Sequence, residues 1–111
     1  MKMDTLEFET GKQNDWVVVK AKGRLDRLNA ADVSVEWEKI QEESQKMVLE
    51  LSEMDYLSSA GIRILLRLSK KAKAEGKEFA LCCGDGFVKE VLEDSNMDML
   101  VKVYDSLDEL A

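Results

Sequence analysis

The sequence contains no histidine and no proline, and it has only two cysteines. Without histidine, a Ser-His-Asp triad and any other histidine-dependent acid–base chemistry are excluded. With no histidine and no CxxC pair, the chain also has almost no ligand set for zinc. We therefore expect neither a metal site nor a cofactor. Because proline is absent, every turn relies on Gly, Asn, Asp or Ser.

Long apolar runs are also missing. No stretch approaches the ~18–20 residues that a membrane-spanning helix needs, and the first residues lack the apolar core of a signal peptide. The net charge of −7 gives no overall attraction to nucleic acid phosphates. It also disfavours an anionic membrane surface, unless a local basic patch exists. We expect a cytoplasmic protein.

The two cysteines, Cys82 and Cys83, are adjacent in a segment with strand character. Neighbouring side chains of a strand point to opposite faces, which disfavours a disulfide between them. We expect buried, reduced thiols.

The 111 residues fit one domain with its own core. Apolar and alternating segments predict five strands, at residues 6–9, 16–21, 47–51, 77–83 and 101–104. The five-residue link 11–15 predicts an antiparallel hairpin. Helical crossovers between the later strands predict parallel pairing. The order β-β-α-β-α-β-α-β-α predicts an α/β fold, a mixed sheet packed with about four helices.

Helix signals separate these strands, although residues 97–100 read as a connector. Asn29 is the expected N-cap of a helix over 30–44, with Leu28 and Val33 as a hydrophobic staple. A second helix over 60–75 ends at Gly76. The third helix starts after Asp85 as N-cap and ends near Asn96 in a left-handed conformation. Its expected core residues are Phe87, Val88, Val91 and Leu92. Ser106 and Glu109 form a capping-box pattern for a terminal helix.

Ser58 and Ser59 stand between the buried strand 47–51 and the second helix. The simplest interpretation is that these hydroxyls, together with Asp55, only cap the helix. A phosphate on Ser59 would, however, meet free backbone N–H groups at the positive end of the helix dipole. Arg63, four residues further on, could reach back toward it. Such a phosphate would change the charge of a surface patch, as a binding switch requires.

No other motif competes with this turn. The sequence has no GxGxxG, Walker, GxSxG or HExxH pattern, and Gly84-Asp85-Gly86 is too short to specify a phosphate loop. A small enzyme or nucleotide-binding domain using Asp26, Asp55 and Asp85 is an alternative, but nothing in the sequence pairs these carboxylates. We expect a protein that is not an enzyme.

Residues 50–52 and 56–66 resemble the signature of the STAS domain, and more narrowly the bacterial anti-sigma factor antagonists. Residues 23–26, 87–98 and 103–109 resemble further segments of that family, so the similarity covers essentially the whole chain, 1–111, as a single STAS domain. Two positions depart from the family pattern. Ser58 replaces a commoner aspartate, and Asn96-Met97 stands where Gly-Leu is more usual.

In that family the phosphorylated serine lies two residues before a glycine, which on this chain makes it Ser59, before Gly61. The resemblance implies that the unphosphorylated protein binds an anti-sigma factor serine kinase and thereby releases a sigma factor. The kinase would use ATP to phosphorylate Ser59, and a metal-dependent PP2C-type phosphatase would reverse it. The nucleotide and metal belong to those partners.

An alternative within the same family is a constitutive partner-binding subunit of a transport or lipid-trafficking complex, in which Ser58 and Ser59 are structural. In either case we expect docking where the loops 23–26, 58–63 and 84–85 converge at one sheet edge. The expected binding residues are Gly23, Asp26, Ser58, Ser59, Gly61, Arg63 and Asp85.

Overall fold

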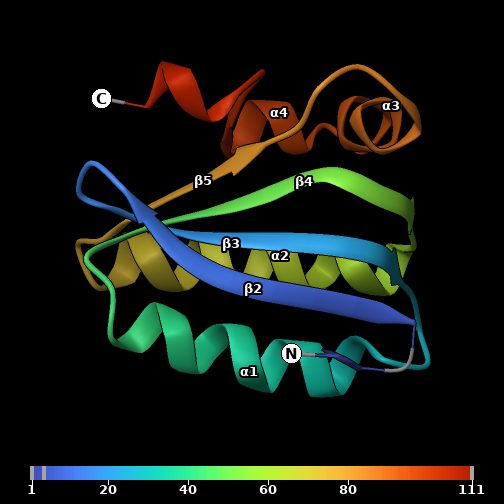
Figure 1. Ribbon diagram of the computed structural model, residues 1–111, viewed down its shortest axis with the longest axis horizontal. Coiled ribbons are helices and arrows are strands. Elements are labelled where there is room, and N and C mark those ends of the chain that lie inside the picture. The colour runs from blue at the N-terminus through green and yellow to red at the C-terminus, as the bar shows by residue number, and fades with distance from the viewer. Residues whose placement is uncertain (1, 4, 111) are drawn as a thin grey trace.

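A computed structural model describes residues 2–3 and 5–110. Within that part, one sheet has the strand order β1-β2-β3-β4-β5-β6 (Figure 1). The strands are β1 Lys2–Met3, β2 Leu6–Gln13, β3 Trp16–Leu25, β4 Lys46–Leu57, β5 Glu78–Cys82 and β6 Lys102–Tyr104. The helices are α1 Ala30–Glu42, α2 Ser59–Ala74, α3 Phe87–Asp94, α4 Met97–Leu100 and a 3-10 turn at Leu107–Glu109. No helix of this part is long and apolar enough to cross a membrane.

The predicted antiparallel hairpin is confirmed, but its turn is shorter than the sequence indicated. Strand β2 continues to Gln13, which pairs with Trp16 at the start of β3. Only Asn14 and Asp15 remain in the turn, and Asn14 adopts a left-handed φ of 56°. Asparagine tolerates that conformation better than most residues, so a two-residue connection is possible here.

The second half of the sheet is parallel, because β3–β4, β4–β5 and β5–β6 all pair in that sense. The strands follow one another across the sheet in chain order. Right-handed crossovers that advance in one direction place their helices on one face. Residues of all four α-helices accordingly share one core with that face. The predicted α/β fold with a mixed sheet is confirmed.

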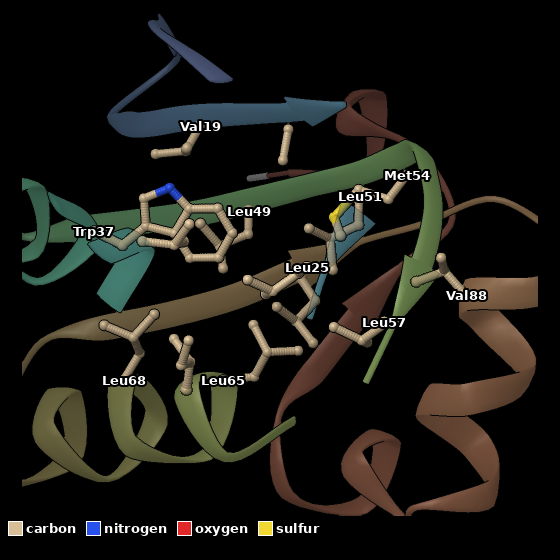
Figure 2. Packing of buried hydrophobic residues seen from close by; sticks show 14 of the residues in the cluster. Val19, Leu25, Trp37, Leu49, Leu51, Met54, Leu57, Leu65, Leu68 and Val88 are labelled. Carbon is tan, nitrogen blue, oxygen red and sulfur yellow. The ribbon is translucent and has the colours of Figure 1, made fainter. Parts of the chain in front are cut away.

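The main core lies between the sheet and these helices. Figure 2 shows Trp37 of α1, Leu65 and Leu68 of α2 and Val88 of α3 around strand residues such as Leu49. A smaller cluster occupies the opposite face, with the C-terminal segment packed over it. Its members are Trp16, Val18, Val48, Ala80, Cys82 and Leu110, with Tyr104 and Leu107 packed against them.

The two cysteines lie on opposite faces of the sheet, as their adjacency predicts. Cys83 belongs to the main core, Cys82 to the smaller cluster, and both are buried free thiols. Burial, helped by the negative charge of Glu50, raises the pKa of Cys82 to about 12, and burial also raises that of Cys83. Both thiols therefore stay protonated near neutral pH.

Strand β4 is much longer than predicted and ends at Leu57 rather than Leu51. Its pairing with β5 stops at Glu50, whereas its pairing with β3 continues through two register shifts to Leu57. Beyond Glu50 the strand therefore has one strand neighbour, and polar residues such as Ser52 and Asp55 face solvent. Those residues interrupt the apolar run from which the strand was predicted.

Several predicted helix ends are wrong. Leu28 is 76% exposed, so it makes no hydrophobic staple with buried Val33. The N-cap of α3 is Gly86 rather than Asp85, and Phe87 at the first helical position is 52% exposed instead of lying in the core.

Among the predictions about helices at residues 76 and 96–109, one is wrong and the rest are confirmed. Residues 97–100 are the short helix α4 rather than a connector. The predicted end at Gly76 is confirmed, with a left-handed φ of 68° and a hydrogen bond from Lys77 N to Ala72 O. Left-handed Asn96 and the capping box of Ser106 and Glu109 are also confirmed, although the last helix is a 3-10 turn.

Candidate functional site

The candidate site lies at the carboxyl ends of β3 and β4, where each strand turns into a helix. In the β4–α2 turn, Ser58 is the N-cap of α2. Its Oγ accepts a hydrogen bond from Gly61 N at 3.2 Å, and its own backbone N donates to Leu25 O at the end of β3 at 3.0 Å. Ser58 is half-buried and joins the two turns. The cap is formed by Ser58 alone, because Asp55 lies exposed within β4.

Ser59 is the first residue of α2 and its side chain is exposed. Within the described part of the chain, its hydroxyl has no hydrogen-bond partner. The N–H groups of Ser59 and Ala60 likewise meet no acceptor there, as is usual for the first turn of a helix. That first turn contains no acidic residue, whereas the first turns of α1 and α3 contain Asp32 and Glu90. The positive end of the α2 dipole is therefore uncompensated by its own helix.

Gly61 sets the distance between α2 and the strands. A Cβ on this buried residue would lie 2.6 Å from Leu57 Cδ1 and 3.0 Å from Leu25 Cγ. Real Cβ atoms essentially never approach another atom to 2.6 Å, and 3.0 Å is tighter than most Cβ contacts, so a side chain here would require the buried Leu57 and Leu25 side chains or the helix to shift. Gly61 is thus a packing residue, and it does not offer a side chain to a partner.

The β3–α1 turn is built around the carboxylate of Asp26. This group accepts hydrogen bonds from Leu28 N at 2.9 Å and Asn29 N at 3.3 Å, and it pairs with Arg24 Nε at 3.3 Å. Desolvation raises the pKa of Asp26, but the hydrogen bonds from Leu28, Arg24 and Asn29 and the charge of Arg24 outweigh it, so the pKa is lowered overall. Asp26 is ionised at neutral pH and serves its own turn.

Asn29 occupies the N-cap position of α1, as predicted, but its side chain braces the β3–α1 turn. Its side chain makes no cap hydrogen bond to α1. Its Nδ2 donates to Arg24 O at 2.9 Å, and its Oδ1 accepts from Asp26 N at 3.0 Å. The residue is fully buried, so these bonds replace the water that its amide loses.

Gly23 is also structural. Its φ is 107°, a value that side chains rarely allow, and a Cβ would lie 2.1 Å from Thr5 O. Arg24 N donates to the same carbonyl at 3.2 Å. Glycine here lets the residue that precedes β2 approach β3 closely.

Sequence reasoning missed a row of three side chains beside the two turns. The Arg24 guanidinium lies 4.7 Å from the centroid of the Tyr56 ring, and that ring stacks on Phe87 with centroids 6.2 Å apart and an angle of 14°. Both rings are partly solvent-exposed, Phe87 by about half. A partial signal was present, because Tyr56 directly follows Asp55 and Phe87 directly follows the Gly84-Asp85-Gly86 loop. Apolar character alone nevertheless placed Phe87 in the core.

The third predicted loop, 84–85, meets the site only along its flank. Gly84 N donates to Ser52 Oγ at 3.2 Å, well before the end of β4. Asp85 is exposed, and the Tyr56–Phe87 stack connects its neighbourhood to the β4–α2 turn. Arg63 is exposed one helical turn after Ser59. The structure thus joins 23–26 directly to 58–63 and places 84–85 beside them.

The carboxylates proposed for the enzyme alternative do not form a described cluster. Asp26 is held in its own turn, Asp55 is exposed on β4, and Asp85 lies in the β5–α3 loop. Among residues 2–3 and 5–110, no group of three or more His, Cys, Asp or Glu side chains could hold a metal ion.

The STAS domain family model matches residues 7–110, and the chain therefore belongs to the STAS domain family. BtrV of Bordetella bronchiseptica, named as an anti-sigma factor antagonist, is 28% identical over 102 residues. The alignment covers 91% of this chain and 88% of that protein. The sequence-based resemblance is confirmed.

Solved structures share the fold. An anti-sigma factor antagonist from Mycobacterium paratuberculosis has a TM-score of 0.85 and 19% identity, over 94% of this chain and 89% of that one. The Bacillus cell fate determinant SpoIIAA in its phosphorylated form has a TM-score of 0.68 and 13% identity, over 93% and 95% of the two chains. At these identities the likeness concerns the fold alone.

Proposed function

We propose that this chain is an anti-sigma factor antagonist switched by phosphorylation of Ser59. Unphosphorylated, it binds an anti-sigma factor serine kinase and so releases a sigma factor. The kinase phosphorylates Ser59 with ATP and ends the complex, and a PP2C-type phosphatase restores the binding form. The family and the name of its Bordetella relative support this function.

The observation that carries the proposal is the unequal use of two adjacent serines. The Ser58 hydroxyl is half-buried and bonded to Gly61 N, whereas the Ser59 hydroxyl is exposed and without a partner in the described chain. A kinase needs an accessible hydroxyl, and only Ser59 offers one without breaking the cap of α2.

The start of α2 also suits a phosphate. Phosphorylation adds about −1.5 to −2 charges and three acceptor oxygens. Free N–H groups, a helix dipole and the absence of an acidic residue in the first turn favour that charge at Ser59. The modified protein should therefore stay folded while the charge of its surface reverses locally. Since Asp26 and Tyr56 flank this surface, a partner docked there would meet the new phosphate directly.

The test is phosphorylation by the kinase partner with ATP, followed by mass analysis of the intact chain and its peptides. We expect one added phosphate on Ser59, absent from Ser59→Ala and retained in the matched variant Ser58→Ala. Phosphate found equally on Ser58, or on neither serine, would contradict the proposal.

A second test separates binding from folding. Ser59→Asp places a negative charge at the same position and should weaken kinase binding, measured by titration calorimetry. Its free energy of unfolding should stay within about 1 kcal/mol of the unmodified chain. Gross unfolding of Ser59→Asp would show that the turn is mainly structural.

A further inference from the structure

Helix α2 is basic along its whole length, in contrast to the chain as a whole. The chain has 23 acidic and 16 basic residues, yet the 16 residues of α2 include no Asp or Glu. Its charged residues are Arg63, Arg67, Lys70, Lys71 and Lys73. Four of these cations line a shallow hollow of about 510 Å³ together with Leu66. We call Arg63, Leu66 and Lys70 the basic ridge, in which Arg63 and Lys70 are exposed and Leu66 is partly buried; Arg67 is also exposed but is bonded to α1.

Two of the cations around the hollow are engaged by α1. Arg67 Nη1 donates to Ser34 Oγ at 3.3 Å, and Lys71 Nζ pairs with Glu42 at 3.1 Å. Arg67 and Lys71 therefore contribute to the packing of α2 against α1. The residues on the outer side of α2 make no such contacts in the described part of the chain.

The cations of the basic ridge have no such role. Arg63 and Lys70 are exposed, and neither forms an ion pair with any residue of 2–3 or 5–110. They are nearly two helical turns apart on the same face, about 10 Å along the axis. Leu66 lies between them, packed against the main core but still partly exposed, and supplies an apolar floor.

We propose that the basic ridge docks an acidic segment of a protein partner. Two carboxylates about 10 Å apart would reach Arg63 and Lys70 together, as on a helix with acidic residues two turns apart. An apolar residue between them would cover Leu66. Arg63 also belongs to the expected docking residues of the proposed function, whereas Leu66 and Lys70 lie beyond them along α2. The inference goes beyond the proposed switch because it does not require Ser59 to be modified.

The distribution of charge on the chain favours a short acidic segment over an extended polyanion as the ligand of the basic ridge. The ridge spans little more than the ~8 Å Debye length at physiological salt. A membrane or a nucleic acid would extend past it onto a chain whose net charge is −7. Glu42 of the neighbouring helix α1 is exposed at the border of the hollow. A compact acidic segment meets the cations without meeting this repulsion.

The test uses a fluorescent alanine-rich helical peptide with two glutamates spaced two turns apart and a leucine between them. Binding to the full, unphosphorylated chain is followed by fluorescence anisotropy, and amide shifts by NMR. We expect shifts centred on Arg63, Leu66 and Lys70, and affinity that falls as salt rises. The double variant Arg63→Glu/Lys70→Glu should bind at least about tenfold more weakly.

A matched control reverses two exposed lysines away from α2, Lys12→Glu/Lys22→Glu, and should bind as the unmodified chain does. Equal weakening in this control, absence of binding, or shifts elsewhere would overturn the proposal. So would tighter binding to anionic phosphatidylserine vesicles or to a DNA duplex than to the peptide. A concentration-dependent dimer that Arg63→Glu/Lys70→Glu abolishes would instead assign the ridge to a second copy.

Folding and the Ser59 switch are controlled separately. Arg63→Lys/Lys70→Arg keeps the charges and should keep peptide affinity, so a loss confined to the charge-reversed variant is not a loss of fold. The peptide assay contains neither kinase nor ATP, so it measures binding to the ridge without the Ser59 switch. Failure of the peptide to bind therefore leaves the phosphorylation test untouched, and the reverse also holds.

Discussion

The two strand-to-helix turns of the site, β3–α1 and β4–α2, both provide acceptors for free backbone N–H groups, but they use different side chains. Each follows a parallel strand, and each satisfies backbone N–H groups with a side-chain oxygen. In β3–α1 the polar side chains of Asp26 and Asn29 both form hydrogen bonds with the backbone of the turn. In β4–α2 the Ser58 side chain forms such a bond, whereas the Ser59 side chain is exposed.

The two turns differ in whether a polar side chain remains free of structural hydrogen bonds. Two polar residues in the first turn both hold the backbone, so neither is available for chemistry without a cost to folding. The second turn separates these tasks, because Ser58 holds the helix start and Ser59 adds nothing to it. A group that contributes little to stability can be modified without unfolding the protein. Substitutions at the contact between the two turns, and within each turn, test this difference.

The largest effect is expected for Gly61→Val, which inserts a branched side chain where the two turns meet. Overpacking against Leu25 and Leu57 should lower the free energy of unfolding by about 1–3 kcal/mol or more, as measured by urea denaturation. Gly11→Val is the matched control, because nothing lies within 4 Å of a Cβ there. Equal loss in both variants would mean that Gly61 is not a close contact between the turns.

Asp26→Ala should destabilise the chain at neutral pH through the β3–α1 turn, and the loss should depend on pH. The folded-state pKa of Asp26 is lowered below the ordinary value of about 3.9. Its contribution is therefore fully present above that value and is lost as pH falls through the folded pKa. Urea unfolding of both proteins should give stabilities that converge in acid. A difference that stays constant with pH would show that the carboxylate charge is not involved.

Ser58→Ala removes the cap of α2 and should cost about 1 kcal/mol. Thermal unfolding of Ser58→Ala and of the conservative Ser58→Asp should show loss in the first and retention in the second, since aspartate is also a good N-cap. Retention in both would mean that Ser58 does not cap the helix in solution.

The smallest effect is expected for Ser59→Ala, which should change the free energy of unfolding by no more than about 0.5 kcal/mol. The side chain is exposed and its hydroxyl bonds to nothing in the described chain. The same thermal unfolding series measures it beside Ser58→Ala. A loss as large as that of Ser58→Ala would erase the distinction between the two serines.

The sequence predicted the order of the main elements, because apolar period and turn residues are local signals. It also predicted the Ser58-Ser59 turn, but either serine fits an N-cap, and only the backbone geometry assigns the cap to Ser58. The length of β4 could not be predicted, since it depends on how far β3 extends beside it. The Tyr56–Phe87 stack depends on where α3 packs, and no local sequence pattern predicts that position.

The outermost strands of the sheet, β1 with two residues and β6 with three, are very short. Long exposed edges template the addition of further strands and lead to aggregation. β1 pairs with only Leu6 and Glu7, so the outer edge of β2 from Phe8 to Gln13 has no strand neighbour among the described residues. Exposed Glu9 and Lys12 lie along this open edge, where charged side chains disfavour the addition of a further strand. The charges of β2, rather than the shortness of β1, therefore protect this side of the sheet from association.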